Sequence, residues 1–115
     1  MTKLLITGAS SKFTEPILEK VKKRFSKIFL ITNNSNLNYR EKKIKHINFN
    51  LLVSAKIPIK VDTIIHMAAI VPYKKKFLTK NLLEENLKIT DNILKYAVNN
   101  KIKKIIFISS TDVYP

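Results

Sequence analysis

The feature that most constrains this chain is its alternation of short apolar runs with segments of helical periodicity. Apolar runs of strand length occupy residues 3–7, 27–32, 44–51, 61–67 and 104–109. Strands that alternate with helices pair in parallel, because each connection must cross from one end of the sheet to the other. The sequence therefore predicts an α/β fold built on a five-stranded parallel sheet.

Two segments between these runs carry the predicted helices. The first begins near Phe13, with Ser10 or Ser11 as its cap, and Ile17, Leu18, Val21 and Phe25 recur along it at helical spacing. The second and longest covers residues 81–99, and its predicted buried stripe is Leu83, Leu87, Thr90, Leu94 and Ala97. Residues 33–43 are polar and are predicted to form a loop or a frayed helix.

The composition limits the classes of protein to which the chain can belong. At 115 residues it suits one domain, and it has no cysteine for disulfides or thiolate metal sites. Two histidines are too few for a multi-histidine metal centre, so no metal is expected. No stretch approaches the roughly 20 apolar residues that span a bilayer, and the start does not read as a signal peptide. We expect a cytoplasmic protein.

The charge is strongly positive, with 22 basic and 8 acidic residues and a net charge of +14. Such an excess is typical of proteins that bind nucleic acids. However, 20 of the basic residues are lysine and two are arginine, whereas bidentate forks on phosphates and bases favour arginine. The lysines are also scattered along a sequence rich in isoleucine and asparagine, as in compositional drift. A nucleic-acid partner is therefore not the expected one.

The first predicted strand ends at Gly8, the only glycine in the chain, and a helix follows. A strand that turns into a helix N-terminus offers free backbone N–H groups and the positive end of the helix dipole, which together hold a phosphate. Ala9, Ser10 and Ser11 are small enough to let a pyrophosphate approach. The other interpretation is an ordinary strand-to-helix turn, since a dinucleotide fingerprint has three glycines.

The end of the second predicted strand lacks the carboxylate that commonly binds the adenosine ribose in such folds. Thr32 and Asn33 stand there instead, so the sequence does not favour NAD over NADP. Arg40 or Lys42 could contact the 2′-phosphate of NADP, although a solvated basic loop is the favoured interpretation of either residue.

Three later segments complete a pattern. They are DTIIHMAA at residues 62–69, NLKITDNIL at 86–94 and FISSTDVYP at 107–115. Together with TGASSKFT at 7–14, the chain resembles the extended short-chain dehydrogenase/reductases, the NAD-dependent epimerase/dehydratase family. Ser11 and Thr14 stand where that family has its second and third glycines, and Ile89 replaces another. The resemblance covers essentially all 115 residues and implies a Rossmann-type doubly wound sheet of order 3-2-1-4-5, ending after strand five, as the N-terminal portion of an NAD(P)-binding domain.

The resemblance also implies roles for individual residues. Ser110 matches the catalytic serine or threonine that hydrogen-bonds the reacting group of the substrate. Contacts with NAD or NADP would involve Gly8, Ser10 and Ser11 at the pyrophosphate, Asn50 at the adenine, Ala68 and Ala69 along the cofactor, and Asn86 at the nicotinamide half, with Lys12, Phe13, Thr32, Asn33, Leu51 and Met67 beside them. His66 is expected to pack at the end of its strand rather than to catalyse.

Other parts of the family pattern are expected to be missing. The general acid/base, a tyrosine in Tyr-x-x-x-Lys, lies some tens of residues beyond the serine segment, and the substrate domain follows it. On this basis the 115 residues lack the motif and hold a cofactor without turning over substrate. The last strand would also be an unpaired hydrophobic edge, which a further strand, a partner chain or a homodimer would cover.

Three functions remain open. The first is the NAD(P)-binding portion of an epimerase/dehydratase-type enzyme that acts on a nucleotide-sugar or a similar small molecule. The second is a non-catalytic dinucleotide-binding or regulatory remnant. The third is a basic RNA- or polyanion-binding protein, for which the aromatic-flanked basic run at residues 73–77 is the best feature.

Overall fold

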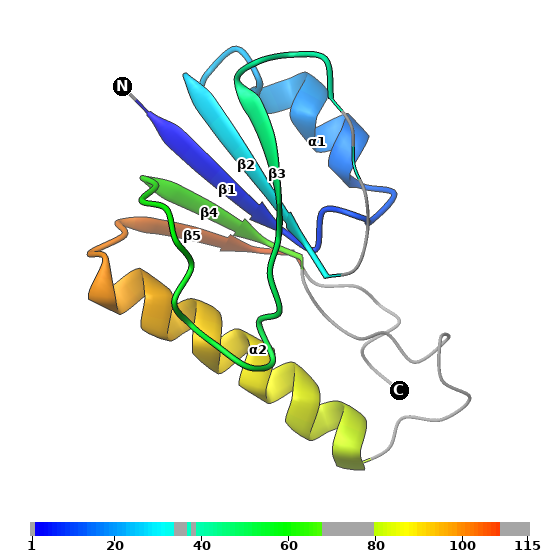
Figure 1. The fold of residues 1–115 in the computed structure, drawn as a ribbon, viewed down its shortest axis with the longest axis vertical. Helices are drawn as coiled ribbons and strands as arrows, with labels where there is room; N and C mark the ends of the chain where they lie inside the picture. The colour runs from blue at the N-terminus through cyan, green and yellow to red at the C-terminus, as the bar shows by residue number, and fades with distance from the viewer. Residues whose placement is uncertain (1, 34–36, 38, 68–79, 109–115) are drawn as a thin grey trace.

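The computed structural model describes residues 2–33, 37, 39–67 and 80–108, which form a parallel sheet with a helix on each face (Figure 1). The strands are β1 (Lys3–Thr7), β2 (Lys27–Thr32), β3 (Ile44–Asn48), β4 (Thr63–His66) and β5 (Lys104–Phe107). The helices are α1 (Thr14–Val21) and α2 (Lys80–Asn99). The predicted α/β class is confirmed.

All five strands are parallel, in the order β3-β2-β1-β4-β5. This confirms the predicted order, in which the chain starts at the centre and crosses to the other half of the sheet between β3 and β4. In such a sheet every strand begins at one edge, the amino edge, and ends at the other, the carboxyl edge. Ligands of open parallel sheets bind beyond the carboxyl edge, near the point where the strand order reverses. Here that point lies between β1 and β4.

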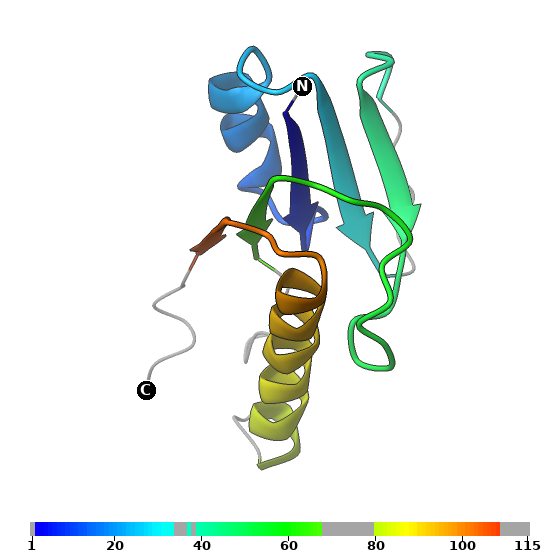
Figure 2. The same ribbon diagram turned by 90° about the vertical axis from the view of Figure 1, so that its left-hand side faces the viewer.

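The alternation of side chains on the strands builds two cores. Leu4 and Ile6 of β1 face α1 and pack with Leu18 of that helix. Leu5, between them, faces α2 and packs with Ile93. Figure 2 shows the two helices on opposite sides of the sheet. Both faces of the central strands are therefore buried, which explains why their sequences read as continuous apolar runs.

Three strands are shorter than the sequence suggested: β5, predicted over 104–109, ends at Phe107, and two others are shortened as well. The third was predicted to reach residue 51, but β3 ends at Asn48 because a turn follows it. In that turn the Asn50 side chain accepts a hydrogen bond from the Leu52 N–H (2.9 Å), and its carbonyl accepts one from the Val53 N–H (3.2 Å). The fourth strand was predicted over 61–67 and covers Thr63–His66. In both cases apolar residues continue past the strand into loops that pack on the core.

Helix α2 confirms the predicted helix, and Ala97 of the predicted buried stripe is buried, but the three leucines of that stripe are not. Leu83, Leu87 and Leu94 are 47%, 70% and 41% exposed, and the buried face consists of Ile89, Asn92, Ile93, Tyr96 and Ala97. The helix carries two apolar stripes, and hydrophobic periodicity alone cannot choose between them. Hydrogen bonds determine which of the two sides of α2 faces the core. The Asn92 amide donates a hydrogen bond to the Leu51 carbonyl, and the Tyr96 hydroxyl donates one to the Ile59 carbonyl. The donor–acceptor distance is 2.5 Å in each case. These bonds attach α2 to the segment between β3 and β4.

Helix α1 begins at Thr14, and neither Ser10 nor Ser11 caps it as predicted. Phe13 occupies the capping position and makes no side-chain cap hydrogen bond. Ser11 instead belongs to the turn before the helix. Its hydroxyl accepts from the Phe13 N–H (3.2 Å) and its carbonyl from the Thr14 N–H (3.1 Å). Pro16 lies in the first helical turn, where the missing N–H costs no hydrogen bond.

The remaining expectations concern the edge strand, the segment after β2 and membrane spans. Strand β5 pairs with β4, and Phe107 and Ile106 on it are exposed, as expected of a hydrophobic edge. Of residues 33–43, the ones that the structure describes contain no helix. None of the described helices has the length and apolar character needed to cross a membrane.

Candidate dinucleotide-binding edge

The turn from β1 to α1 depends on the one glycine of the chain. Gly8 has φ = 65°, a left-handed conformation that costs other residues roughly 1–2 kcal/mol. Its carbonyl accepts the Ser11 N–H (3.0 Å), and the Ala9 N–H donates to the Ile31 carbonyl of β2 (3.0 Å). The turn is thereby held against the carboxyl edge of the sheet, and no Cβ projects from it at Gly8.

Thr14 stands at the position where the resembled family has its third glycine. That glycine allows close packing between helix and strand. Here Thr14 is 2% exposed, and its hydroxyl donates to the Ala9 carbonyl (2.8 Å). The larger side chain is therefore accommodated with its polar atom satisfied. The loss of this glycine does not disrupt the turn.

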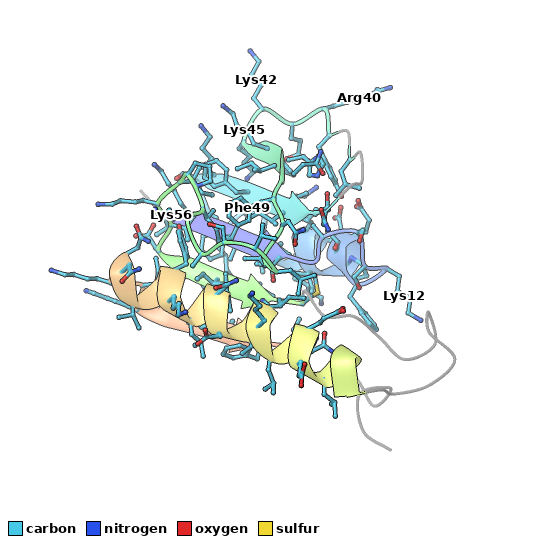
Figure 3. All side chains as sticks on the ribbon, turned by 60° about the horizontal axis from the view of Figure 1, so that its bottom comes forward. Lys12, Arg40, Lys42, Lys45, Phe49 and Lys56 are labelled. Carbon is cyan, nitrogen blue, oxygen red and sulfur yellow. The ribbon has the colours of Figure 1, made fainter. Side chains whose placement is uncertain are left out.

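The turn leaves backbone donors for a ligand. Within the described residues, the N–H groups of Ser10 and Lys12 donate no hydrogen bond. They lie just before the N-terminus of α1, where the helix dipole favours an anion. The Lys12 side chain is exposed and points away from the turn, with Nζ 5.5 Å from the centre of the Phe13 ring (Figure 3). This donor set fits the pyrophosphate of a dinucleotide.

At the end of β2, Thr32 belongs to a hydrogen-bonded cluster with two side chains of β3. Its Oγ1 lies 2.5 Å from His46 Nε2 and 3.2 Å from Asn48 Oδ1. The Leu37 N–H donates to His46 Nδ1 (3.5 Å). The Thr32 hydroxyl donates to Asn48 Oδ1 and thereby joins the His46 ring to that amide. A ribose at this point would meet hydroxyl and amide groups, with Asn33 exposed beside them.

The basic residues considered for a 2′-phosphate belong to a segment that leads to the amino edge. The Lys43 carbonyl accepts the Ile28 N–H at the start of β2 (2.8 Å), so the residues just before β3 lie at that edge. Lys42 is therefore remote from the Thr32 cluster, and Arg40 precedes it by two residues.

Asn50 and Leu51 lie in the turn that follows β3. The Asn50 Oδ1 is engaged by the Leu52 N–H, which leaves the amide N–H₂ as the group available to an adenine. Leu51 is buried in the core under α2, and its carbonyl accepts the Asn92 amide. Its contribution to this edge is therefore to hold the turn.

At the end of β4, His66 is joined to Thr7 of β1. The Thr7 hydroxyl lies 2.7 Å from His66 Nδ1 and accepts the Met67 N–H (3.1 Å). Burial lowers the pKa of His66 to about 4, so the ring is neutral at pH 7. The ring also meets Phe107 of β5 edge-on, at 5.5 Å between centroids. These contacts agree with the packing role expected of His66, and they hold Met67 beside the Gly8 turn.

The structure says less about the other predicted site residues. Asn86 is half-buried in the first half of α2. Ala68, Ala69 and Ser110 lie outside the described residues, as does the basic run at 73–77. Among the residues that are described, no three histidine, cysteine or carboxylate side chains gather as a metal site.

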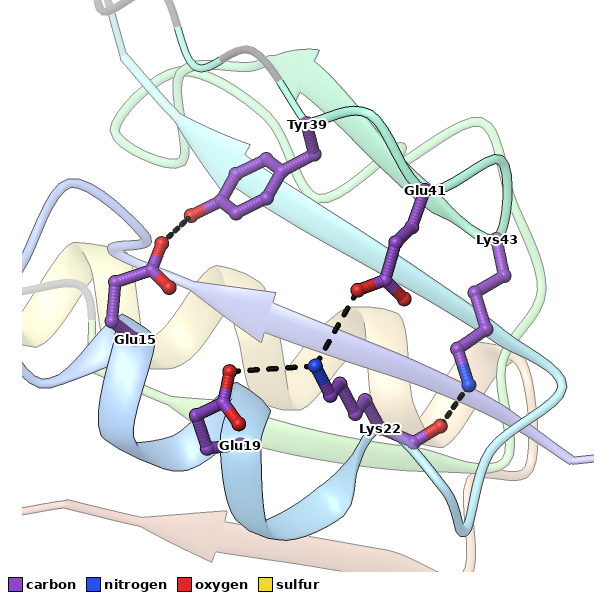
Figure 4. A network of polar contacts seen from close by, with 6 residues as sticks. All are labelled: Glu15, Glu19, Lys22, Tyr39, Glu41 and Lys43. Atoms are coloured by element: carbon purple, nitrogen blue, oxygen red, sulfur yellow. Dashed lines mark hydrogen bonds and ion pairs between the residues drawn. The ribbon is translucent and has the colours of Figure 1, made fainter.

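Tyr39 and Lys43 have the spacing Tyr-x-x-x-Lys, so the prediction that the chain lacks this motif is wrong as far as the sequence pattern is concerned. They do not form an acid/base pair. The Tyr39 hydroxyl donates to Glu15 (2.8 Å), and burial together with this carboxylate raises the pKa of Tyr39 to about 12. Lys43 donates to the Lys22 carbonyl instead (Figure 4). A catalytic tyrosine of this type needs a lowered pKa, so this pair matches the motif in spacing alone.

Sequence reasoning missed three polar residues that shape this edge: Thr7, His46 and Asn48. Each lies within two residues of a strand end, and polar residues at such positions in parallel strands meet at one edge. That signal was present in the sequence. Which hydroxyl bonds which ring could only come from the strand register, in which Thr7 pairs with His66 and Thr32 with Asn48.

Comparisons with known proteins agree with this geometry. Uronate dehydrogenase from Agrobacterium tumefaciens has a TM-score of 0.78 at 19% identity, over 96% of this chain and 41% of that one. A UDP-galactose 4-epimerase gives 0.78 at 18% identity, over 97% and 39%. WbmH from Bordetella bronchiseptica, solved in complex with NAD+, gives 0.71 at 18%, over 91% and 38%. At these identities the likeness concerns the fold, and the chain spans about two fifths of each protein.

Sequence comparisons, unlike these likenesses in fold, identify a family. No curated protein sequence matches the chain. A protein family does match, and the match runs over residues 4–115, from the start of β1 through the FISSTDVYP segment. The chain belongs to the NAD dependent epimerase/dehydratase family.

Proposed function

We propose that this chain binds the pyrophosphate of NAD or NADP at the turn between β1 and α1. The observation that carries the proposal is the Gly8 turn, which leaves the N–H groups of Ser10 and Lys12 unengaged by described residues just before the N-terminus of α1. An anion there meets backbone donors and the helix dipole and needs no side-chain charge. The match to an NAD-dependent family and the NAD+ complex of WbmH support this cofactor.

We further propose that the chain is the cofactor-binding part of an epimerase/dehydratase-type enzyme that acts on a nucleotide-sugar or a similar molecule. The bound nicotinamide would accept and return a hydride. The residues of this chain would bind and orient the cofactor, through the turn at its pyrophosphate and the amide of Asn50 at its adenine. Ser110 would hydrogen-bond the reacting oxygen of the substrate. The chain would turn over substrate only together with a general acid/base, which Tyr39 does not provide.

The test of dinucleotide binding is a substitution at Gly8, measured by NADH fluorescence and by calorimetry with NADH and NADPH. Gly8→Val places a branched side chain where the backbone must approach the pyrophosphate and adopt φ = 65°. We expect the variant to stay folded by circular dichroism and to lose NADH affinity at least about tenfold, as expected for the loss of about 1.4 kcal/mol of binding free energy.

Ser10→Ala is the matched control in the same turn. It removes an exposed hydroxyl and keeps the backbone N–H, so it should bind NADH like the unchanged chain. If Gly8→Val keeps its NADH affinity, the turn is not the cofactor site. If Ser10→Ala loses affinity to the same extent, the donors are side chains and the backbone interpretation is wrong. The ratio of NADH to NADPH affinities, measured in the same titrations, decides between the two cofactors.

A further inference from the structure

The basic residues that look scattered in the sequence gather along the amino edge of the sheet. Twelve of the 22 lie within the four residues before a strand or at its first two positions, against two of the eight acidic residues. They are Lys3, Lys23, Arg24, Lys27, Arg40, Lys42, Lys43, Lys45, Lys60, Lys101, Lys103 and Lys104. We call this set the lysine edge. It lies opposite the candidate cofactor edge, because all strands run in the same direction.

The lysine edge is not neutralised by the protein itself. None of its twelve cations forms an ion pair with a described residue. The two carboxylates at this edge are already engaged. Asp62 accepts the Lys3 backbone N–H (2.7 Å), and Glu41 pairs with Lys22 (3.5 Å), which is outside the set. Uniform compositional drift would distribute the excess charge over the surface and would not concentrate it at one edge.

At the centre of the edge, three lysines of adjacent strands lie together. Lys3 is directly opposite Lys27 in the register, and the neighbouring strand carries Lys45. Repulsion from Lys45, with a smaller contribution from Lys3, lowers the pKa of Lys27. Like charges placed side by side on a sheet destabilise it. Lys42 and Lys45 extend outward around the start of β3 (Figure 3).

Helix dipoles account for only part of this arrangement. Both helices end at the amino edge, and cations near a helix C-terminus are favourable, which explains Lys23, Arg24 and Lys101. The effect falls off within the last turn, so it does not explain Lys3, Lys27 or Lys45, which are on strands. Those three repel one another without compensation from within the described chain, and an external anion would relieve the repulsion.

We propose that the lysine edge binds the phosphate backbone of single-stranded RNA, a function separate from dinucleotide binding. Five strands spaced about 4.8 Å apart give a row about 19 Å long, which suits a linear polyanion. Ten of the twelve residues are lysines, whose point charges contact phosphates and carry no base readout. Protein interfaces favour arginine and aromatic side chains and are depleted in lysine, and membrane-surface helices need apolar anchors. The twelve residues are ten lysines and two arginines, Arg24 and Arg40, and none of them is aromatic or apolar.

The test measures binding of a fluorescent 20-nucleotide poly(U) at a series of salt concentrations. Each phosphate contact on a single strand contributes about 0.7 to the slope of log K against log salt. Removing two contacts with the Lys27→Gln/Lys45→Gln double variant should therefore lower the slope by about 1.4. The matched control is Lys88→Gln/Lys95→Gln, which removes the same charge from the exposed surface of α2, where Lys95 is paired with Asp91 (3.1 Å). Its slope should stay unchanged.

Three results would overturn the proposal: no RNA binding by the unchanged chain at 50 mM salt, an unchanged slope in the Lys27/Lys45 variant, or an equal loss in the control. An equal loss would mean that the net charge binds RNA diffusely. Circular dichroism and thermal melting check the fold, and relief of repulsion should leave Tm equal or higher. NADH affinity, measured on the same variants, should not change, so failure here leaves the cofactor assignment untouched.

Discussion

The buried histidine at the end of β4 should make the stability of this protein depend on pH. His66 is 5% exposed, and its Nδ1 is hydrogen-bonded to the Thr7 hydroxyl at 2.7 Å. Burial lowers its pKa from 6.5 to about 4. The unfolded chain therefore binds a proton at a higher pH than the folded chain does. The contribution of His66 to stability is fully present above pH 6.5 and is lost as the pH falls from 6.5 to about 4.

The size of the effect follows from the difference between the two pKa values. At about 1.4 kcal/mol per pH unit, the free energy of unfolding should fall by about 3 kcal/mol across this interval. For a domain of this size, that is a large fraction of a typical total stability of about 5–15 kcal/mol. Protonation would also leave both ring nitrogens as donors, so Nδ1 would have to donate to the Thr7 hydroxyl.

The assay is urea unfolding followed by circular dichroism at several pH values between 7 and 4.5, on the unchanged chain and on His66→Asn. The asparagine Oδ1 can accept from Thr7 but has no proton to gain. Carboxylates titrate in both proteins, so the difference between the two curves isolates His66. Proton NMR of the imidazole provides an independent check. Parallel stability curves, or a His66 resonance that titrates near 6.5 in the folded protein, would refute the reasoning.

The remaining predictions concern helix α2. Ile93→Ala should lower the free energy of unfolding by about 2–5 kcal/mol, because Ile93 is fully buried. Leu87→Ala, on the exposed stripe, should change the free energy of unfolding by less than about 0.5 kcal/mol. Urea unfolding measures both variants. A larger loss for Leu87→Ala than for Ile93→Ala would show that the leucine stripe faces the core. Tyr96→Phe should cost about 1–3 kcal/mol by leaving the Ile59 carbonyl unpaired. Burial raises the pKa of Tyr96 to about 12, so no phenolate absorbance from it should appear below pH 10.

The fold was predictable from the sequence because its signals are local and repeated. Each apolar run that was long enough for a strand became one, and the family motifs fixed their order. The predictions were wrong where the local sequence allows two arrangements that are equally apolar. Helix α2 has leucines on one side and isoleucines with Tyr96 on the other, and only contacts with the segment between β3 and β4 select the buried side. Such contacts join residues 37 to 41 positions apart, beyond the range of any periodicity.

The candidate site was predictable in place but not in detail. Gly8 had to begin the phosphate turn, because no other residue in the chain tolerates φ = 65° without cost. The replacement of the third glycine by Thr14 looked like degradation of the motif. Its hydroxyl bond to the Ala9 carbonyl was not predictable, since it depends on the angle at which α1 leaves the turn. Spacing alone was also misleading at Tyr39 and Lys43, where the environment opposes the chemistry that the motif serves.

The same topology that builds a cofactor edge also produces the lysine edge, and this gives a way to separate the two. Parallel strands with crossover helices place helix N-termini at one edge and strand starts at the other. An anion at the first edge is held by N–H groups of fixed geometry, so a dinucleotide should bind with a shallow salt dependence. An anion at the lysine edge is held by mobile charges, so RNA binding should weaken steeply with salt. If the two sites are independent, saturating NADH will leave the RNA affinity unchanged. Displacement of RNA by NADH would instead place both ligands at the Gly8 turn and would argue against a separate lysine edge.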